Sequence, residues 1–72
     1  MVVMRIRLKV KDVAVKRGLT RAALARRADL TYETVFKLWN DQYRDVSLMT
    51  LVKLAVAMNV DVSELYEIID SD

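Results

Sequence analysis

Two apolar-periodic segments, residues 21–28 and 32–40, are separated by only three residues, Asp29 to Thr31. Apolar residues that recur every three to four positions predict an amphipathic helix in each segment. Three residues are too few to let the two helices lie antiparallel, so the helices must cross at a steep angle, as in a helix-turn-helix. Such a close crossing requires a small residue, which Ala25 provides. The apolar residues available to fill the wedge between the helices are Leu24, Leu30, Val35 and Leu38.

The helix boundaries are marked by polar capping residues, because the chain has no proline and only one glycine. Four residues stand directly before apolar-periodic runs and can each accept a hydrogen bond from an unpaired backbone N–H: Thr20, Thr31, Ser47 and Asp61. Asp61 with Glu64 three residues later resembles a capping box. Gly18 and Asn59 can adopt the left-handed conformation that ends a helix. These signals predict five helices, over residues 10–17, 21–28, 32–40, 48–58 and 62–69.

The predicted helices each turn one apolar face toward a shared core, so the fold class is all-α. The expected core residues are Val10, Val13, Ala14, Leu24, Ala25, Ala28, Val35, Leu38, Trp39, Leu51, Leu54, Ala55, Met58, Val62 and Leu65. With 72 residues and no linker-like tract, the chain is expected to form one domain, residues 1–72.

The amino-acid composition excludes several classes of function. The chain has no cysteine and no histidine, which excludes disulfide scaffolds, thiolate nucleophiles, Cys/His zinc sites and imidazole acid–base chemistry. We therefore expect no cofactor, no metal and no enzymatic activity. The longest apolar run, Leu54 to Met58, is far shorter than the roughly 20 residues of a membrane span. We expect a soluble, cytoplasmic protein that does not interact with a membrane.

The net charge of +2 conceals a strong asymmetry along the chain. Residues 1–44 contain eleven of the twelve Lys and Arg residues and four acids, an excess of seven positive charges. Residues 45–72 contain one Lys and six acids, an excess of five negative charges. A polyanion such as nucleic acid would be attracted to the first half and repelled by the second. Charge alone fits equally well with a merely solubilising surface.

The segment "LTRAALARRADLTYETVFKLWN", Leu19 to Asn40, resembles the helix-turn-helix of the lambda-repressor and Cro-type family of DNA-binding domains. The segment "RLKVKDVAVKRG" resembles the first helix of that family, and "SLMTLVKLAVAMNVDVSELYEII" resembles its fourth and fifth helices. The resemblance covers residues 9–69 and implies a five-helix lambda-repressor-like domain. Two residues depart from the family pattern: Asp29 and Asp41 stand where glycine is common. Aspartate tolerates the left-handed conformation, so we expect the turn to form with some strain.

In this family the third helix lies in the DNA major groove and its first residues read base edges. The resemblance therefore implies base contacts by Tyr32, Glu33, Thr34, Phe36 and Lys37. The helical projection independently places residues 32, 33, 36, 37 and 40 on a stripe opposite the apolar face. Lys37 could donate to guanine, Glu33 could accept from cytosine, and Phe36 could contact a thymine methyl group.

Contacts to the DNA backbone are expected where the helix N-termini point their N–H groups at phosphates. Thr20 and Thr31 mark those N-termini, and Arg21 stands where the family commonly has glutamine. The other residues expected to contact the backbone are Arg26, Asn40 and Arg44.

The sequence alone also allows simpler explanations for why these side chains are present. Tyr32 and Phe36 could cover an apolar partner, or stabilise their own helix as a pair four residues apart. Glu33 could pair with Lys37 at the same spacing. Trp39 is expected in the core rather than at the DNA, and the pair Arg26 and Arg27 could be only a solvated face.

The stretch before the first helix differs from the rest, because Met4, Ile6 and Leu8 alternate with basic residues at the period of a β-strand. We expect a strand over residues 2–8 with these three side chains facing the core. A lone strand needs a partner for its backbone groups. That partner could be the same strand in a second subunit or an extended segment of its own chain, such as Arg44 to Val46.

Together these patterns predict a sequence-specific regulator that binds double-stranded DNA, a repressor that occupies an operator as a homodimer. The dimer surface would come from the leading strand or the last predicted helix. The alternative is a protein-interaction module with the same fold, such as an antitoxin, whose acidic second half would suit a basic protein partner.

Overall fold

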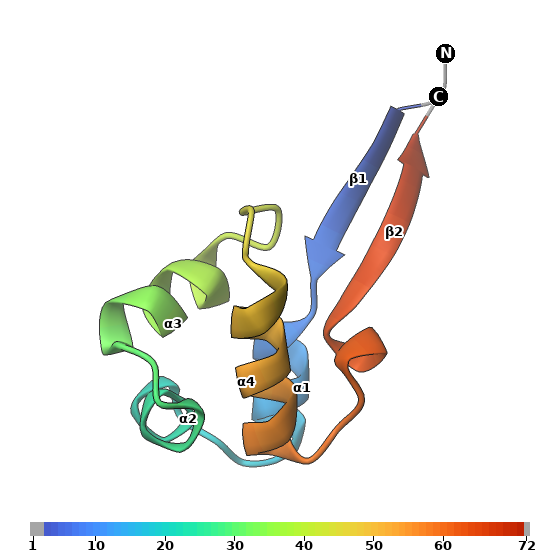
Figure 1. The fold of residues 1–72 in the computed structure, drawn as a ribbon. Helices are drawn as coiled ribbons and strands as arrows, with labels where there is room; N and C mark the ends of the chain where they lie inside the picture. Colours follow the sequence, from blue (N-terminus) through green and yellow to red (C-terminus); the bar gives the residue numbers. More distant parts are fainter. Residues whose placement is uncertain (1–2, 72) are drawn as a thin grey trace.

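The computed structural model describes residues 3–71 and is mostly helical, with a small two-stranded sheet (Figure 1). Four α-helices, one 3-10 turn and two strands are present within these residues. Their order is β1 (Val3–Leu8), α1 (Val10–Lys16), α2 (Arg21–Ala28), α3 (Tyr32–Asn40), α4 (Leu48–Met58), η1 (Val62–Leu65) and β2 (Tyr66–Ser71). The bounds of α2, α3 and α4 are those expected from the caps, and α1 ends one residue earlier. Val2, expected in the strand, lies outside the described residues.

The four predicted N-caps all form. The hydroxyl oxygens of Thr20, Thr31 and Ser47 each accept a hydrogen bond of 3.1 Å from the backbone N–H three residues later. Asp61 and Glu64 form the predicted capping box, with the Asp61 N–H donating to Glu64 Oε2 over 2.9 Å. These local bonds begin the helices at the observed positions because they satisfy donors that have no partner within a helix.

The left-handed conformation occurs at Gly18, Asp29 and Asn59. Asp29 therefore takes the role that glycine commonly plays after the second helix, with φ 55° and ψ 46°. Asp41 does not, because its backbone is extended at φ −122°. The Asp41 carboxylate instead accepts a hydrogen bond of 3.1 Å from the N–H of Tyr43 and so shapes the loop that follows α3.

One apolar core joins all the helices and the end of β1 that leads into α1. The expected members are buried, except that Val13, Trp39 and Val62 are only partly covered. Leu8 from β1 is also in this core, with 2% of its surface exposed. The core therefore ties the first strand to the helical body through one side chain.

The fifth helix expected over residues 62–69 does not form. After the capping box, η1 lasts for four residues, and the backbone becomes extended at Tyr66, with φ −150° and ψ 160°. Residues 66–71 form β2, antiparallel to β1, with Ile6 opposite Ile68 and Leu8 opposite Tyr66. The segment is rich in aromatic and β-branched residues, which suit a strand, and it supplies the backbone partner that β1 requires. The partner is thus within the chain, but it is not the segment Arg44 to Val46.

The two strands project from the helices as an arm (Figure 1). The molecule is 41 Å long but only about 20 Å across, because the arm extends beyond the core. The expectation that Met4, Ile6 and Leu8 all face the core is wrong for the first two, whose side chains are 66% and 56% exposed. Of these three apolar residues, only Leu8, at the base of the arm, is buried against the helical body.

Arg7 connects the strands to each other and to the helices. Its guanidinium donates to Glu67 on β2 and, over 3.2 Å, to Gln42 in the loop after α3. It also forms an ion pair of 3.5 Å with Asp12 on α1. The hydrogen bond to Glu67 raises the pKa of Arg7 above its ordinary value. These contacts fix the direction in which the arm leaves the body.

Candidate nucleic-acid interface

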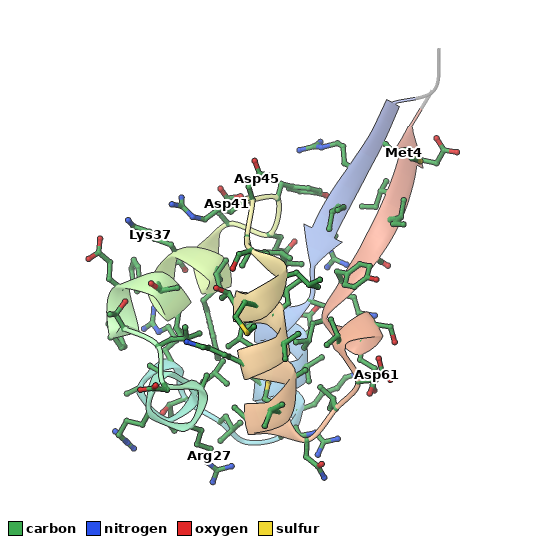
Figure 2. The ribbon with its side chains drawn as sticks, in the orientation of Figure 1. Met4, Arg27, Lys37, Asp41, Asp45 and Asp61 are labelled. Atoms are coloured by element: carbon green, nitrogen blue, oxygen red, sulfur yellow. The ribbon has the colours of Figure 1, made fainter. Side chains whose placement is uncertain are left out.

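The second and third helices cross through the short connection Asp29 to Thr31. Val35 and Leu38 on α3 are buried against α2, where Leu24 and Ala25 are buried in turn. Because these residues fix the inner face of α3, the opposite face must point to solvent. Figure 2 shows Lys37 on this outer side of α3.

Five residues form an exposed stripe along α3: Tyr32, Glu33, Phe36, Lys37 and Asn40. Tyr32 and Phe36 are unusual for a surface, since 49% and 42% of these large aromatic residues are exposed. Four of the five predicted base-contact residues therefore lie together on the accessible face.

Thr34 is the exception. Its side chain is partly buried, and its hydroxyl lies 2.8 Å from that of Thr31, within the N-cap of α3. The hydroxyls of Thr20 and Thr31 accept the capping bonds described above. These three threonines thus hold the N-termini of α2 and α3.

Arg21, the first residue of α2, lies over the two aromatic residues of α3. Its guanidinium carbon is 5.1 Å from the centre of the Phe36 ring and 6.0 Å from that of Tyr32. The two rings are themselves 6.1 Å apart. A guanidinium at this distance is attracted to an aromatic face, which orders its long side chain. The sequence predicts Arg21 as a phosphate contact but does not predict this cluster, because the cluster depends on the angle at which the helices cross.

Glu33 and Lys37 form an ion pair of 3.0 Å on the same stripe. The hydrogen bond from Lys37, and then its charge, lower the pKa of Glu33. Both side chains are exposed, and exposed pairs of this kind are weak. Lys37 can therefore leave Glu33 for a stronger acceptor at little cost.

The other predicted backbone-contact residues, Arg26, Asn40 and Arg44, are exposed. Arg27 lies apart from the stripe, and Figure 2 shows it at the other end of the body from Lys37. Two acids, Asp41 and Asp45, stand in the loop after α3, on the same side as Lys37 (Figure 2).

Within residues 3–71, no group of three or more acidic, histidine or cysteine side chains is arranged to hold a metal ion. None of the helices in this part of the chain is long and apolar enough to cross a membrane.

The arrangement of capped helices and an exposed stripe agrees with the comparison to known families. The family model of the Cro/C1-type HTH DNA-binding domain matches residues 9–71 of this chain. The chain belongs to this family. The resemblance identified in the sequence is thereby confirmed, and the Cro/C1-type domain is one that binds DNA in the regulation of transcription.

Two solved structures resemble this Cro/C1-type domain. The restriction-modification controller protein C.AhdI from Aeromonas hydrophila is 27% identical, with a TM-score of 0.71 over 78% of this chain and 83% of that one. A candidate DNA-binding protein from Bacteroides fragilis is 26% identical, with a TM-score of 0.75 over 86% of this chain and 98% of that one. The comparison with curated proteins gave no match.

Proposed function

We propose that this Cro/C1-type domain is a sequence-specific transcriptional repressor that binds an operator as a homodimer, with α3 in the major groove. The exposed stripe on α3 is the observation that carries the proposal. Contiguous exposed apolar surface marks an interaction site, and here the neighbouring rings of Tyr32 and Phe36 stand beside Arg21 and Lys37, two cations suited to an anionic surface.

Four side chains of the stripe are assigned to base reading. Lys37 donates to the guanine O6 and N7 atoms, Glu33 accepts from cytosine N4, and Phe36 packs on a thymine methyl group. Tyr32 completes the base-reading surface. Thr34 supports the cap of α3 and reaches DNA through the helix N-terminus rather than through a base.

The phosphate backbone would be held by groups at the edges of the stripe. The N–H groups at the starts of α2 and α3, which follow Thr20 and Thr31, face an anion favourably. Arg21 lies against the Phe36 ring at the start of α2, where its charge would favour a nearby phosphate. The remaining backbone contacts would come from Arg26 and Asn40.

One domain of this size makes few base contacts, so useful specificity requires two copies on half-sites about one helical turn, roughly 34 Å, apart. The repressor role follows the same logic, since a dimer seated on an operator blocks access to the DNA. That C.AhdI is a controller protein agrees with a regulatory role for this chain.

An antitoxin-like role in binding a basic protein has less support. The acids of the second half would have to form the contact surface, yet Glu67 is paired with Arg7 and Glu64 belongs to the capping box. We therefore favour DNA as the partner of the exposed stripe.

Selection of bound fragments from random duplex DNA, followed by fluorescence anisotropy on the selected sequence, tests the proposal. Lys37→Ala should cost about 1–3 kcal/mol on the selected sequence and relax the preference at one base pair. Arg21→Ala should weaken all sequences alike and reduce the slope of log affinity against log salt by about 0.9. Arg27→Ala is the matched control on α2, because Arg27 lies away from the stripe and its loss should change binding little.

Wild-type protein that binds neither selected nor random duplex at about 50 mM salt contradicts the proposal, because non-specific binding is strongest there. A Lys37→Ala protein with unchanged base preference refutes the role of α3 in reading sequence.

A further inference from the structure

The arm carries an apolar face that no other part of the described chain covers. Met4, Ile6 and Ile68 lie on the same face in the observed register and are 56% to 66% exposed. A two-stranded ribbon is marginally stable in water unless something packs against it. A contiguous apolar surface of this kind marks an interaction site.

The uncovered face continues into a groove of about 680 Å³ between the arm and the start of α4. Leu48, at the first position of α4, is 69% exposed at the rim of this groove. The apolar and aromatic residues that line it include Ile6, Ile68, Tyr43, Val46, Leu48 and Leu51. The groove therefore extends the apolar face of the arm onto the helical body.

We propose that a second copy of this chain occupies the groove, with the arms of the two copies packed face to face and antiparallel about a two-fold axis. The inference deepens the proposed function, because it names the surface through which the repressor would dimerise. In such a symmetric contact the tip of each arm meets the base of the other.

Charge complementarity favours a second copy as the occupant. Arg5, Arg44 and Asp45 line the groove and leave it with a net positive charge. The tip of the arm carries Asp70 on the apolar face, directly opposite Met4. Antiparallel packing brings the acidic tip of one copy to the basic groove of the other, twice in each dimer. In this arrangement Asp70 of one copy pairs with Arg44 of the other.

The position of the groove is compatible with DNA binding. None of its lining residues belongs to α2 or α3, so a second copy seated there leaves the exposed stripe free. Arg44, which the sequence also predicts as a DNA-backbone contact, lines the groove and is assigned to the dimer contact instead. Twelve residues line the groove, whereas a stable interface uses about 20 residues and 800 Å² on each partner. The dimer should therefore be weak in solution and depend on protein concentration.

Sedimentation equilibrium of the full chain without DNA tests the inference. The wild-type mass should rise toward that of a dimer as concentration increases. Ile68→Lys should weaken dimerisation about a hundredfold, because two apolar side chains are lost from each dimer and two charges are introduced. Val56→Lys is the matched control, since Val56 is 75% exposed on α4 outside the groove and its replacement should leave the mass unchanged.

A charge exchange tests the pairing of tip and groove. Arg44→Asp and Asp70→Arg should each weaken the dimer several-fold, and the double variant should recover most of the loss. Far-ultraviolet circular dichroism checks that each variant is folded. Met4→Lys, at an exposed position on the same face, serves as a second variant where Ile68→Lys fails to fold.

Wild-type protein that stays monomeric at every concentration overturns the inference, as does an Ile68→Lys protein that dimerises as tightly as Val56→Lys. Neither result depends on DNA, so this failure is distinct from a failure of the wild type to bind duplex DNA.

Discussion

The charge of Asp29 should make the end of α2 less stable than the end of α4, although the two ends have the same backbone geometry. Asp29 and Asn59 both take the left-handed conformation, with φ 55° and 56°. In each case the next N–H, of Leu30 or Val60, donates over 3.0 Å to the carbonyl oxygen five residues earlier. The two residues differ in charge, and a negative charge at a helix C-terminus is unfavourable by about 0.3–1 kcal/mol.

Reciprocal substitutions isolate this effect. Asp29→Asn should raise the free energy of unfolding by about 0.3–1 kcal/mol, and Asn59→Asp should lower it by a similar amount. For a domain of this size, that shifts the melting temperature by about 2–6 °C in each direction. Among the described residues no ion pair within 4.0 Å offsets Asp29, so the full effect should be visible at low salt.

Urea unfolding at low protein concentration, in low salt and in about 1 M salt, measures both variants. Screening over about 3 Å at 1 M should remove most of each difference. An Asp29→Asn protein no more stable than wild type at low salt, or a gain that persists unchanged at high salt, refutes the reasoning. A gain at Asp29 without the matching loss at Asn59 shows that the cause is local to the turn rather than the helix end.

Three further predictions concern the core, the loop after α3 and the pair of Glu33 with Lys37. Leu24→Ala, at a fully buried position between α2 and α3, should cost about 2–5 kcal/mol in urea unfolding, whereas Val56→Ala at an exposed position should change stability by less than about 0.5 kcal/mol. Asp41→Asn should strengthen duplex binding in low-salt anisotropy but not at high salt, because it removes a negative charge beside α3 and keeps the acceptor for the Tyr43 N–H. Because Lys37 lowers the pKa of Glu33 in the folded state, the stabilisation from this pair is complete at neutral pH and is lost as the pH falls through that lowered pKa. Unfolding measured from neutral to acid pH should therefore be slightly less pH-dependent for Glu33→Gln, and a steeper dependence would contradict the assignment.

The helices could be predicted from the sequence because their limits depend on nearby residues. Thr20, Thr31 and Ser47 each bond to a backbone N–H only three residues away, so the short segments around them contain the whole signal. The exposed stripe on α3 could be predicted for the same reason, because the burial of Val35 and Leu38 determines which side chains of this helix point outward.

The segment after Asp61 could not be predicted in the same way. Val62 and Leu65 have helical spacing, and Tyr66 and Ile68 have strand spacing, so the local pattern supports both structures. The choice depends on β1, whose Arg7 bonds to Glu67 at a separation of 60 residues. The contact of Arg21 with Phe36 could not be predicted for a similar reason, because it depends on the crossing angle of α2 and α3 as well as on their sequences.

The pairing of β1 with β2 also changes how dimerisation can be tested. Removal of residues 1–8 would delete the strand that carries Met4 and Ile6, two residues of the proposed dimer surface. However, Leu8 is 2% exposed in the core, and β1 is the backbone partner of residues 66–71. Loss of one such leucine costs about 2–5 kcal/mol, against a total of about 4–11 kcal/mol for a domain of this length. A monomeric truncated chain would therefore reflect lost folding as readily as a lost interface. Substitutions at the exposed positions Met4 and Ile68 change the surface and leave Leu8 in place, so they distinguish the two causes.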